Sequence, residues 1–100
     1  MYRQGDVLLV PIERPEGVEP EAAGEIVLAL GEVTGHRHRF AGRSRSGARA
    51  YRKGPDRFVE VLRGARLVHE EHSTIDVAPG FYEVVIQSEY DEGLVRQVVD

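Results

Sequence analysis

The chain of 100 residues contains no cysteine. Without thiols it can form no disulfide and no iron–sulfur cluster, and it cannot use the thiolate ligands of cysteine zinc fingers. The absence gives no signal about the redox compartment. Any metal bound by this chain must therefore be held by nitrogen and oxygen atoms.

Long apolar runs are missing as well. No segment approaches the roughly 18 apolar residues of a membrane-spanning helix, and residues 1–6 lack the apolar region of a signal peptide. From these absences we expect no membrane partner and a cytoplasmic location.

The chain does contain many short apolar segments separated by turn residues such as Gly54-Pro55-Asp56 and Pro79-Gly80. Their length, β-branched content and two-residue alternation are typical of strands, and no helical period extends over a useful length. The predicted strands cover residues 7–12, 25–33, 35–40, 51–53, 57–62, 65–69, 73–77, 81–90 and 94–99. This pattern predicts an all-β fold, a small single-domain β-barrel or sandwich of short, mostly antiparallel strands.

The size of the chain predicts one β domain over residues 1–100. Two segments interrupt the strand pattern. Residues 13–24 are rich in glutamate, proline, glycine and alanine and are expected to form an acidic loop. Residues 41–50 combine small residues with arginine and are expected to form a basic flexible loop.

All four histidines occur in two short pairs, His36-Arg37-His38 and His69-Glu70-Glu71-His72. Side chains alternate between the two faces of a strand, so His36 and His38 are expected to share one face. Two adjacent imidazoles, with a second pair to meet them, provide the nitrogen ligands that a first-row transition metal requires. The sequence predicts a metal site formed by His36, His38, His69 and His72, and hydrogen-bonded structural imidazoles are the alternative.

The second pair cannot lie on one face of a straight strand, because its members are three residues apart. A tight hairpin with Glu70 and Glu71 at its tip, or one helical turn, would bring His69 and His72 together. Four histidine ligands would make a closed structural site, whereas three with water or a carboxylate would make an open one. Zinc is the first choice of divalent transition metal, and nickel, copper, iron and manganese remain open.

Glu70 and Glu71 are the catalytic candidates, although no catalytic residue is established. One of the two is expected to be a solvated turn residue. The other could be a metal ligand, a general base on a metal-bound water or an acceptor that orients an imidazole.

The segment from 37 to 57 supports an alternative function. It contains eight of the thirteen basic residues of the chain and one acid, Asp56, although the net charge of the chain is −4. Together with Phe40, Tyr51 and Phe58 for stacking, these cations could bind nucleic acid or a smaller anion. The candidate residues are Arg37, Arg39, Arg43, Arg45, Arg49, Arg52 and Lys53, and in this interpretation the histidines are structural.

Several motifs in succession resemble a family of small uncharacterised bacterial and phage proteins. They are Arg3-Gln4-Gly5-Asp6-Val7, then residues 31–38 (GEVTGHRH), then residues 67–72 (LVHEEH) and residues 79–84 (PGFYEV). This resemblance covers nearly the whole chain and implies no known activity. The His-x-His motif also resembles, loosely, the first metal motif of the cupins. The cupin glutamate would fall at Ala41 or Gly42, so that Glu70 or Glu71 would have to supply the carboxylate.

The sequence thus predicts a small metal-binding β protein, acting as a metal-dependent enzyme or as a ligand sensor. Its expected partners are the metal ion and a small-molecule ligand, with nucleic acid as the alternative. The sequence does not decide whether the protein is an enzyme, nor does it indicate an oligomeric state.

Overall fold

The computed structural model describes residues 1–30, 35–42, 45–91 and 94–97, and from residue 88 onward only the backbone is described. These residues form twelve β-strands and no α-helix, so the prediction of an all-β fold is confirmed. Within the same ranges, no helix is long and apolar enough to cross a membrane.

The larger sheet has six strands in the order β1-β2-β10-β7-β6-β3, and every neighbouring pair is antiparallel. The strands are β1 (Tyr2–Gln4), β2 (Val7–Pro11), β3 (Glu19–Pro20), β6 (Ala48–Lys53), β7 (Asp56–Val61) and β10 (Gly80–Ile86).

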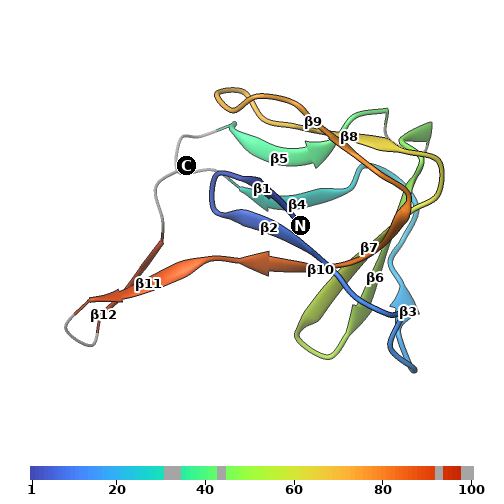
Figure 1. Cartoon of the computed structure of the whole chain (residues 1–100), viewed down its shortest axis with the longest axis horizontal. Coiled ribbons are helices and arrows are strands. Elements are labelled where there is room, and N and C mark those ends of the chain that lie inside the picture. Colours follow the sequence, from blue (N-terminus) through green and yellow to red (C-terminus); the bar gives the residue numbers. More distant parts are fainter. Residues whose placement is uncertain (31–34, 43–44, 92–93, 98–100) are drawn as a thin grey trace.

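The smaller sheet has four antiparallel strands in the order β4-β5-β8-β9. They are β4 (Val27–Leu30), β5 (Arg37–Phe40), β8 (Ala65–Val68) and β9 (Ile75–Val77). A separate hairpin of β11 (Ser88–Asp91) and β12 (Leu94–Gln97) extends away from both sheets (Figure 1).

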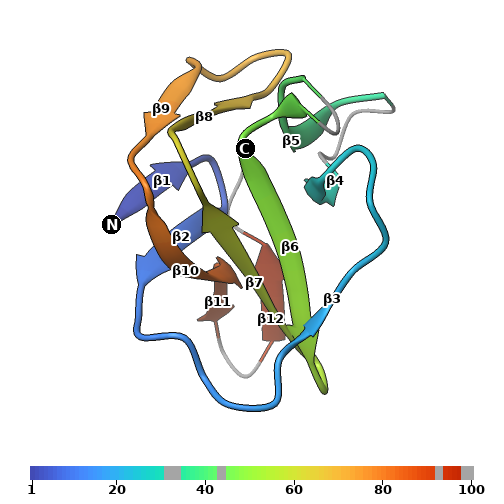
Figure 2. The same cartoon turned by 90° about the vertical axis from the view of Figure 1, so that its right-hand side faces the viewer.

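The two sheets enclose a common apolar core, which makes the fold a sandwich and not a closed barrel. Val7 and Leu9 of β2 are fully buried, as the alternation of that strand predicts, and they share the core with Phe40 of β5 and Leu67 of β8. Figure 2 shows the smaller sheet above the larger one. Burial of such side chains contributes about 1.5–3 kcal/mol each, so this shared core is what holds the sheets together.

The β6–β7 hairpin confirms the turn predicted at Gly54-Pro55-Asp56. Lys53 pairs with Asp56, which leaves Gly54 and Pro55 as the two central residues. Gly54 has a φ of +58°, and the proline ring requires a negative φ at the next position. This combination is that of a II′ turn, whose twist matches the right-handed twist of paired strands.

Several strand boundaries differ from the sequence prediction. β1 was not predicted, and the predicted strand 81–90 is interrupted at Gln87, whose N–H donates to the carbonyl of Asp6 at 2.8 Å. Predicted loop 13–24 contains the two-residue strand β3, and β6 begins at Ala48, inside predicted loop 41–50. Of predicted strand 25–33, the described residues form only β4, and residues 31–34 lie outside the described part. The register between β4 and β5 shifts between Val27 and Ala29.

An ion pair connects the segment after β3 to β7. Both carboxylate oxygens of Glu21 accept hydrogen bonds from the guanidinium of Arg57, each at 2.9 Å. Arg57 also donates to the carbonyls of Val27 and Leu28, so one side chain joins three segments. The hydrogen bond from Arg57 is the largest influence on Glu21 and holds the pKa of its carboxyl below the ordinary value of 4.5.

Replacement of Leu67 by alanine should lower the free energy of unfolding by about 3 kcal/mol, because it leaves a cavity between the sheets. Leu30 offers a matched control, since its side chain is 72 % exposed whereas that of Leu67 is 1 % exposed. The same substitution at Leu30 should change stability by less than about 0.5 kcal/mol in urea denaturation. Equal losses for the two variants would contradict the assignment of Leu67 to the core.

Glu21→Gln should reduce stability at neutral pH by about 1 kcal/mol, because it replaces a charged bidentate hydrogen bond at a partly exposed site with a neutral one. Since the folded-state pKa of Glu21 is lowered, its contribution is fully present above pH 4.5 and is lost as the pH falls through the folded-state value. The difference between wild type and variant, measured by thermal unfolding, should therefore shrink in acid. A difference independent of pH would be inconsistent with this ion pair.

Candidate functional site

The structure brings all four histidines together. His38 lies on β5 and His36 directly before it, while His69 and His72 lie in the loop that joins β8 to β9 and passes close to β5 (Figure 1). The ring centroids of His38 and His69 are 4.3 Å apart, and those of His69 and His72 are 4.6 Å apart. His38 and His72 are separated by 5.8 Å, and His36 and His69 by 5.6 Å. We call these four residues the histidine cluster.

These separations are of the size that a shared metal requires. Imidazoles bound to one tetrahedral ion through bonds of about 2.1 Å have ring centroids about 5 Å apart. Among the described residues, however, no three histidine, aspartate or glutamate side chains stand in the arrangement of a completed metal site. The rings are close enough to share an ion but would have to turn to do so.

The loop from His69 to His72 forms neither the tight hairpin nor the helical turn that the sequence predicted. It is a series of bends between the end of β8 at Val68 and the start of β9 at Ile75. The backbone N–H of Glu71 donates to Nδ1 of His69 at 3.0 Å, so in the neutral ring the proton is on Nε2, and His69 could bind an ion only if this hydrogen bond were exchanged. The Nε2 atom of His72 is buried and has no hydrogen-bond partner among the described residues.

Two residues of the β1–β2 hairpin complete the site and were not predicted. Gln4 and Asp6 are each 3 % exposed, and both contact His38, which is fully buried. Oε1 of Gln4 lies 2.9 Å from Nδ1 of His38, and Oδ1 of Asp6 lies 3.3 Å from Nε2 of the same ring. Both residues stand in the Arg3-Gln4-Gly5-Asp6 motif, which has the composition of an ordinary turn, so no local signal marks them as buried.

The orientation of the Gln4 amide determines which nitrogen of His38 carries a proton. Nε2 of Gln4 donates to the carbonyls of Leu67 and Ser73 at 3.0 and 2.9 Å, so its oxygen must face the histidine. That oxygen can only accept, and Nδ1 of His38 is therefore the donor. Nε2 of His38 is thus directed to Asp6, where it can bind a proton or a metal.

Glu70 and Glu71, the catalytic candidates, have different surroundings. Oε1 of Glu70 accepts a hydrogen bond of 2.7 Å from the backbone N–H of Arg37, between His36 and His38. This bond is the main reason why the pKa of Glu70 lies below its ordinary value of 4.5. Glu70 therefore connects the two histidine pairs, whereas Glu71 is 58 % exposed and its Oε1 lies 3.7 Å from Nδ1 of His36.

The basic segment is partly neutralised by glutamates. Arg37 forms an ion pair of 2.7 Å with Glu25, and Arg52 lies 3.6 Å from Glu21. Arg39 lies next to the histidine cluster on β5, Arg49 and Lys53 lie on β6, and Arg45 precedes β6. Arg43 is outside the described residues. The predicted cations are therefore spread over both sheets instead of forming one surface.

The aromatic side chains predicted to stack on bases are not accessible. Phe40 is fully buried in the core, and Tyr51 and Phe58 are each 5 % exposed. Tyr51 and Phe58 pack against Phe81, and the guanidinium of Arg14 lies 4.7 Å from the centre of the Tyr51 ring. These rings are therefore not available for stacking, because Phe40 belongs to the main core and Tyr51 and Phe58 form a second small cluster with Phe81.

Comparison with known proteins agrees with an uncharacterised family. No curated protein and no solved structure matches the chain. Residues 3–87 match the model of a family described as a domain of unknown function, DUF8820. This match includes both histidine pairs and the hairpin that carries Gln4 and Asp6, and the chain therefore belongs to the DUF8820 family.

Proposed function

We propose that this protein binds one divalent transition metal at the histidine cluster, with zinc as the first choice. The observation that supports this most directly is the buried Nε2 of His72, which has no partner among the described residues and belongs to a ring 4.6 Å from that of His69. A buried nitrogen without a hydrogen bond costs about 1–3 kcal/mol, and a bound cation would remove that cost.

His38 and His72 are proposed ligands, and His69, whose ring centroid lies 4.3 Å from that of His38 and 4.6 Å from that of His72, would join them once its Nδ1 released the N–H of Glu71. The neighbouring Asp6 can take a fourth position. Two ligand atoms on one tetrahedral ion with bonds of about 2.1 Å lie about 3.4 Å apart. The 3.3 Å between Nε2 of His38 and Oδ1 of Asp6 is compatible with that spacing as well as with a hydrogen bond.

Gln4 would act as the residue that orients a ligand without touching the metal. Histidine ligands commonly donate their second ring N–H to an oxygen acceptor, which fixes the tautomer and the ring orientation. Gln4 provides this acceptor for His38, and the carbonyls of Leu67 and Ser73 hold its amide in place. A metal-bound His38 would use Nε2, the atom that faces Asp6.

His36 occupies the outer side of the proposed site. Its side chain is 20 % exposed and its ring lies against His69. It can therefore complete a closed site or leave room for water and a small ligand, which would make the protein a metal-dependent enzyme or a ligand sensor. The resemblance to cupins is limited to His-x-His, and cupin-like chemistry and a cytoplasmic location remain predictions from the sequence.

Nucleic-acid binding through the 37–57 segment remains the alternative. It is less well supported because Arg37, Arg52 and Arg57 are engaged by glutamates and because the aromatic rings are buried. Within the described residues, no row of cations with exposed aromatic rings between them follows one face.

Untagged protein treated with a chelator should take up one equivalent of Zn²⁺, measured by calorimetry. Free zinc at about 100 times Kd should stabilise the fold by about 2.7 kcal/mol and raise Tm. Variant His36→Gln/His72→Gln should lose both effects while keeping its Tm in the absence of metal within a few degrees. Glu16→Gln, an exposed carboxylate far from the cluster in sequence, is the control. Absence of binding with zinc, nickel and cobalt would refute the proposal.

Metal affinity should fall steeply below about pH 6.5, where free imidazole becomes protonated and protons compete for the same nitrogens. The midpoint of Zn²⁺ binding is measured in buffers of about pH 8, 7, 6 and 5, which bracket the pKa of free imidazole, about 6.5. Occupancy that does not change across this series would argue against histidine ligation.

A further inference from the structure

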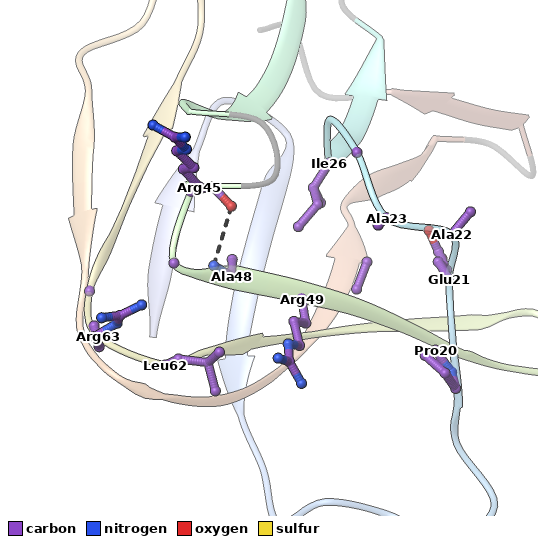
Figure 3. Close-up of a pocket in the computed structure, with 15 residues that line it drawn as sticks. Pro20, Glu21, Ala22, Ala23, Ile26, Arg45, Ala48, Arg49, Leu62 and Arg63 are labelled. Atoms are coloured by element: carbon purple, nitrogen blue, oxygen red, sulfur yellow. Dashed lines mark hydrogen bonds between the residues drawn. The ribbon is translucent and has the colours of Figure 1, made fainter.

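A second candidate site lies at the opposite end of β8 from the histidine cluster. It is a cavity of about 860 Å³ between the segment after β3, the start of β6 and the β7–β8 turn (Figure 3). Gly64 lines it, and His69 follows five residues later at the far end of the strand. At about 3.3 Å per residue the two sites are about 17 Å apart. We call this cavity the arginine pocket.

The inner wall of the arginine pocket is apolar. Ile26, Ala48 and Ala50 line it on the core face of β6, where Ile26 and Ala50 are also members of the main core. Leu62 lines it on the other face of the sheet (Figure 3). The small alanines of β6 leave the space that larger side chains would fill. A cavity of this volume with an apolar wall is of the size that holds a small organic molecule.

Three arginines also line the pocket. Arg45 comes from the segment before β6, Arg49 from β6 and Arg63 from the β7–β8 turn, as Figure 3 shows. None of the three side chains forms a hydrogen bond or an ion pair with another residue in the described part of the chain. Their charges are therefore available to a ligand.

The carboxylate that lines the pocket does not neutralise these charges. Both oxygens of Glu21 are already bound by Arg57, and Arg52 lies 3.6 Å away. Neither of these two cations is a lining residue. Among the described lining residues, Arg45, Arg49 and Arg63 outnumber the single carboxylate, Glu21, and the lining therefore carries an excess of positive charge next to apolar side chains.

The backbone holds this part of the pocket in a defined shape. The N–H of Leu62 donates to the carbonyl of Gly47 at 2.8 Å, and the N–H of Ala48 donates to Oγ of Ser46 at 3.2 Å. A Cβ atom at Gly47 would lie 2.7 Å from the carbonyl oxygen of Gly64, so only glycine permits this close approach. A rim that is already ordered loses little conformational entropy when a ligand binds.

We propose that the arginine pocket binds a small organic anion, in which an apolar group carries a carboxylate or phosphate. The apolar group lies beside Ile26 and Ala48 at the edge of β6, and the anionic group pairs with Arg49 and Arg63 near Leu62, on the other face of the strand. Guanidinium groups suit both anions because they donate two parallel hydrogen bonds to them. A concave apolar wall favours a small molecule over a nucleic-acid strand, which needs stacking platforms and a continuous cationic track.

The proposal can be tested by NMR of the backbone amides, with 2-naphthoate and phenyl phosphate as probes and 2-naphthamide as the uncharged control. A chelator present throughout keeps the result independent of the histidine cluster. Either anion should cause saturable shifts confined to residues 20–26, 45–50 and 62–64, with a Kd of about 1 mM or tighter. The amide should bind at least about tenfold more weakly, because it lacks the charge that the arginines recognise.

Arg49→Gln and Arg63→Gln should each weaken binding of the anions by about tenfold. Lys53→Gln removes the same charge at an exposed position of the β6–β7 hairpin that does not line the pocket, and it should leave the affinity unchanged. Shifts that are absent at about 5 mM probe, or equal binding of amide and acid, would overturn the proposal. Equal losses in Lys53→Gln and Arg49→Gln, or tighter binding of a single-stranded oligonucleotide to the same amides, would also overturn it.

Discussion

The side chain of Gln4 joins the two sheets at the end of the molecule that carries the histidines. Its amide extends from β1 in the larger sheet and makes three hydrogen bonds, to Leu67 of β8, to Ser73 and to His38. Each such bond contributes about 1 kcal/mol, but a buried amide group left unpaired costs about 1–3 kcal/mol. The packing of the two sheets at this end therefore requires that all three hydrogen bonds of the Gln4 side chain form.

This hydrogen-bond pattern has a chemical result. Two backbone carbonyls decide which way the Gln4 amide faces, and the amide then decides which nitrogen of His38 is protonated. Glu70 adds a second connection, since it accepts from the N–H of Arg37 and so holds the loop with His69 and His72 against β5. The position of the four imidazoles thus follows from backbone groups that do not themselves take part in any chemistry.

The sequence predicted β2 well from a continuous apolar run and β7 from a strand-like segment next to a turn signal, and the presence of two histidine pairs predicted their meeting. It did not reveal Gln4 and Asp6, because a polar residue in a short strand or turn shows its burial only through contacts that are distant in sequence, 34 and 63 positions away for Gln4. For Asp6 the contact is with His38. The break between β10 and β11 was also hidden, since Gln87 fits the alternation of a continuous strand. The arginine pocket has no periodic pattern at all, because small residues and turns form most of its lining.

The hydrogen bonds of Gln4 also bear on the order in which the molecule assembles. Its partners lie 34, 63 and 69 positions along the chain, so this network can form only after three hairpins have docked on one another. Closing such long loops is slow and entropically costly, and contacts of this kind are expected late in folding. An unfolded chain could present His36 with His38, or His69 with His72, but not both pairs together. An ion at the histidine cluster would consequently bind the folded chain after it has formed and would not direct its folding.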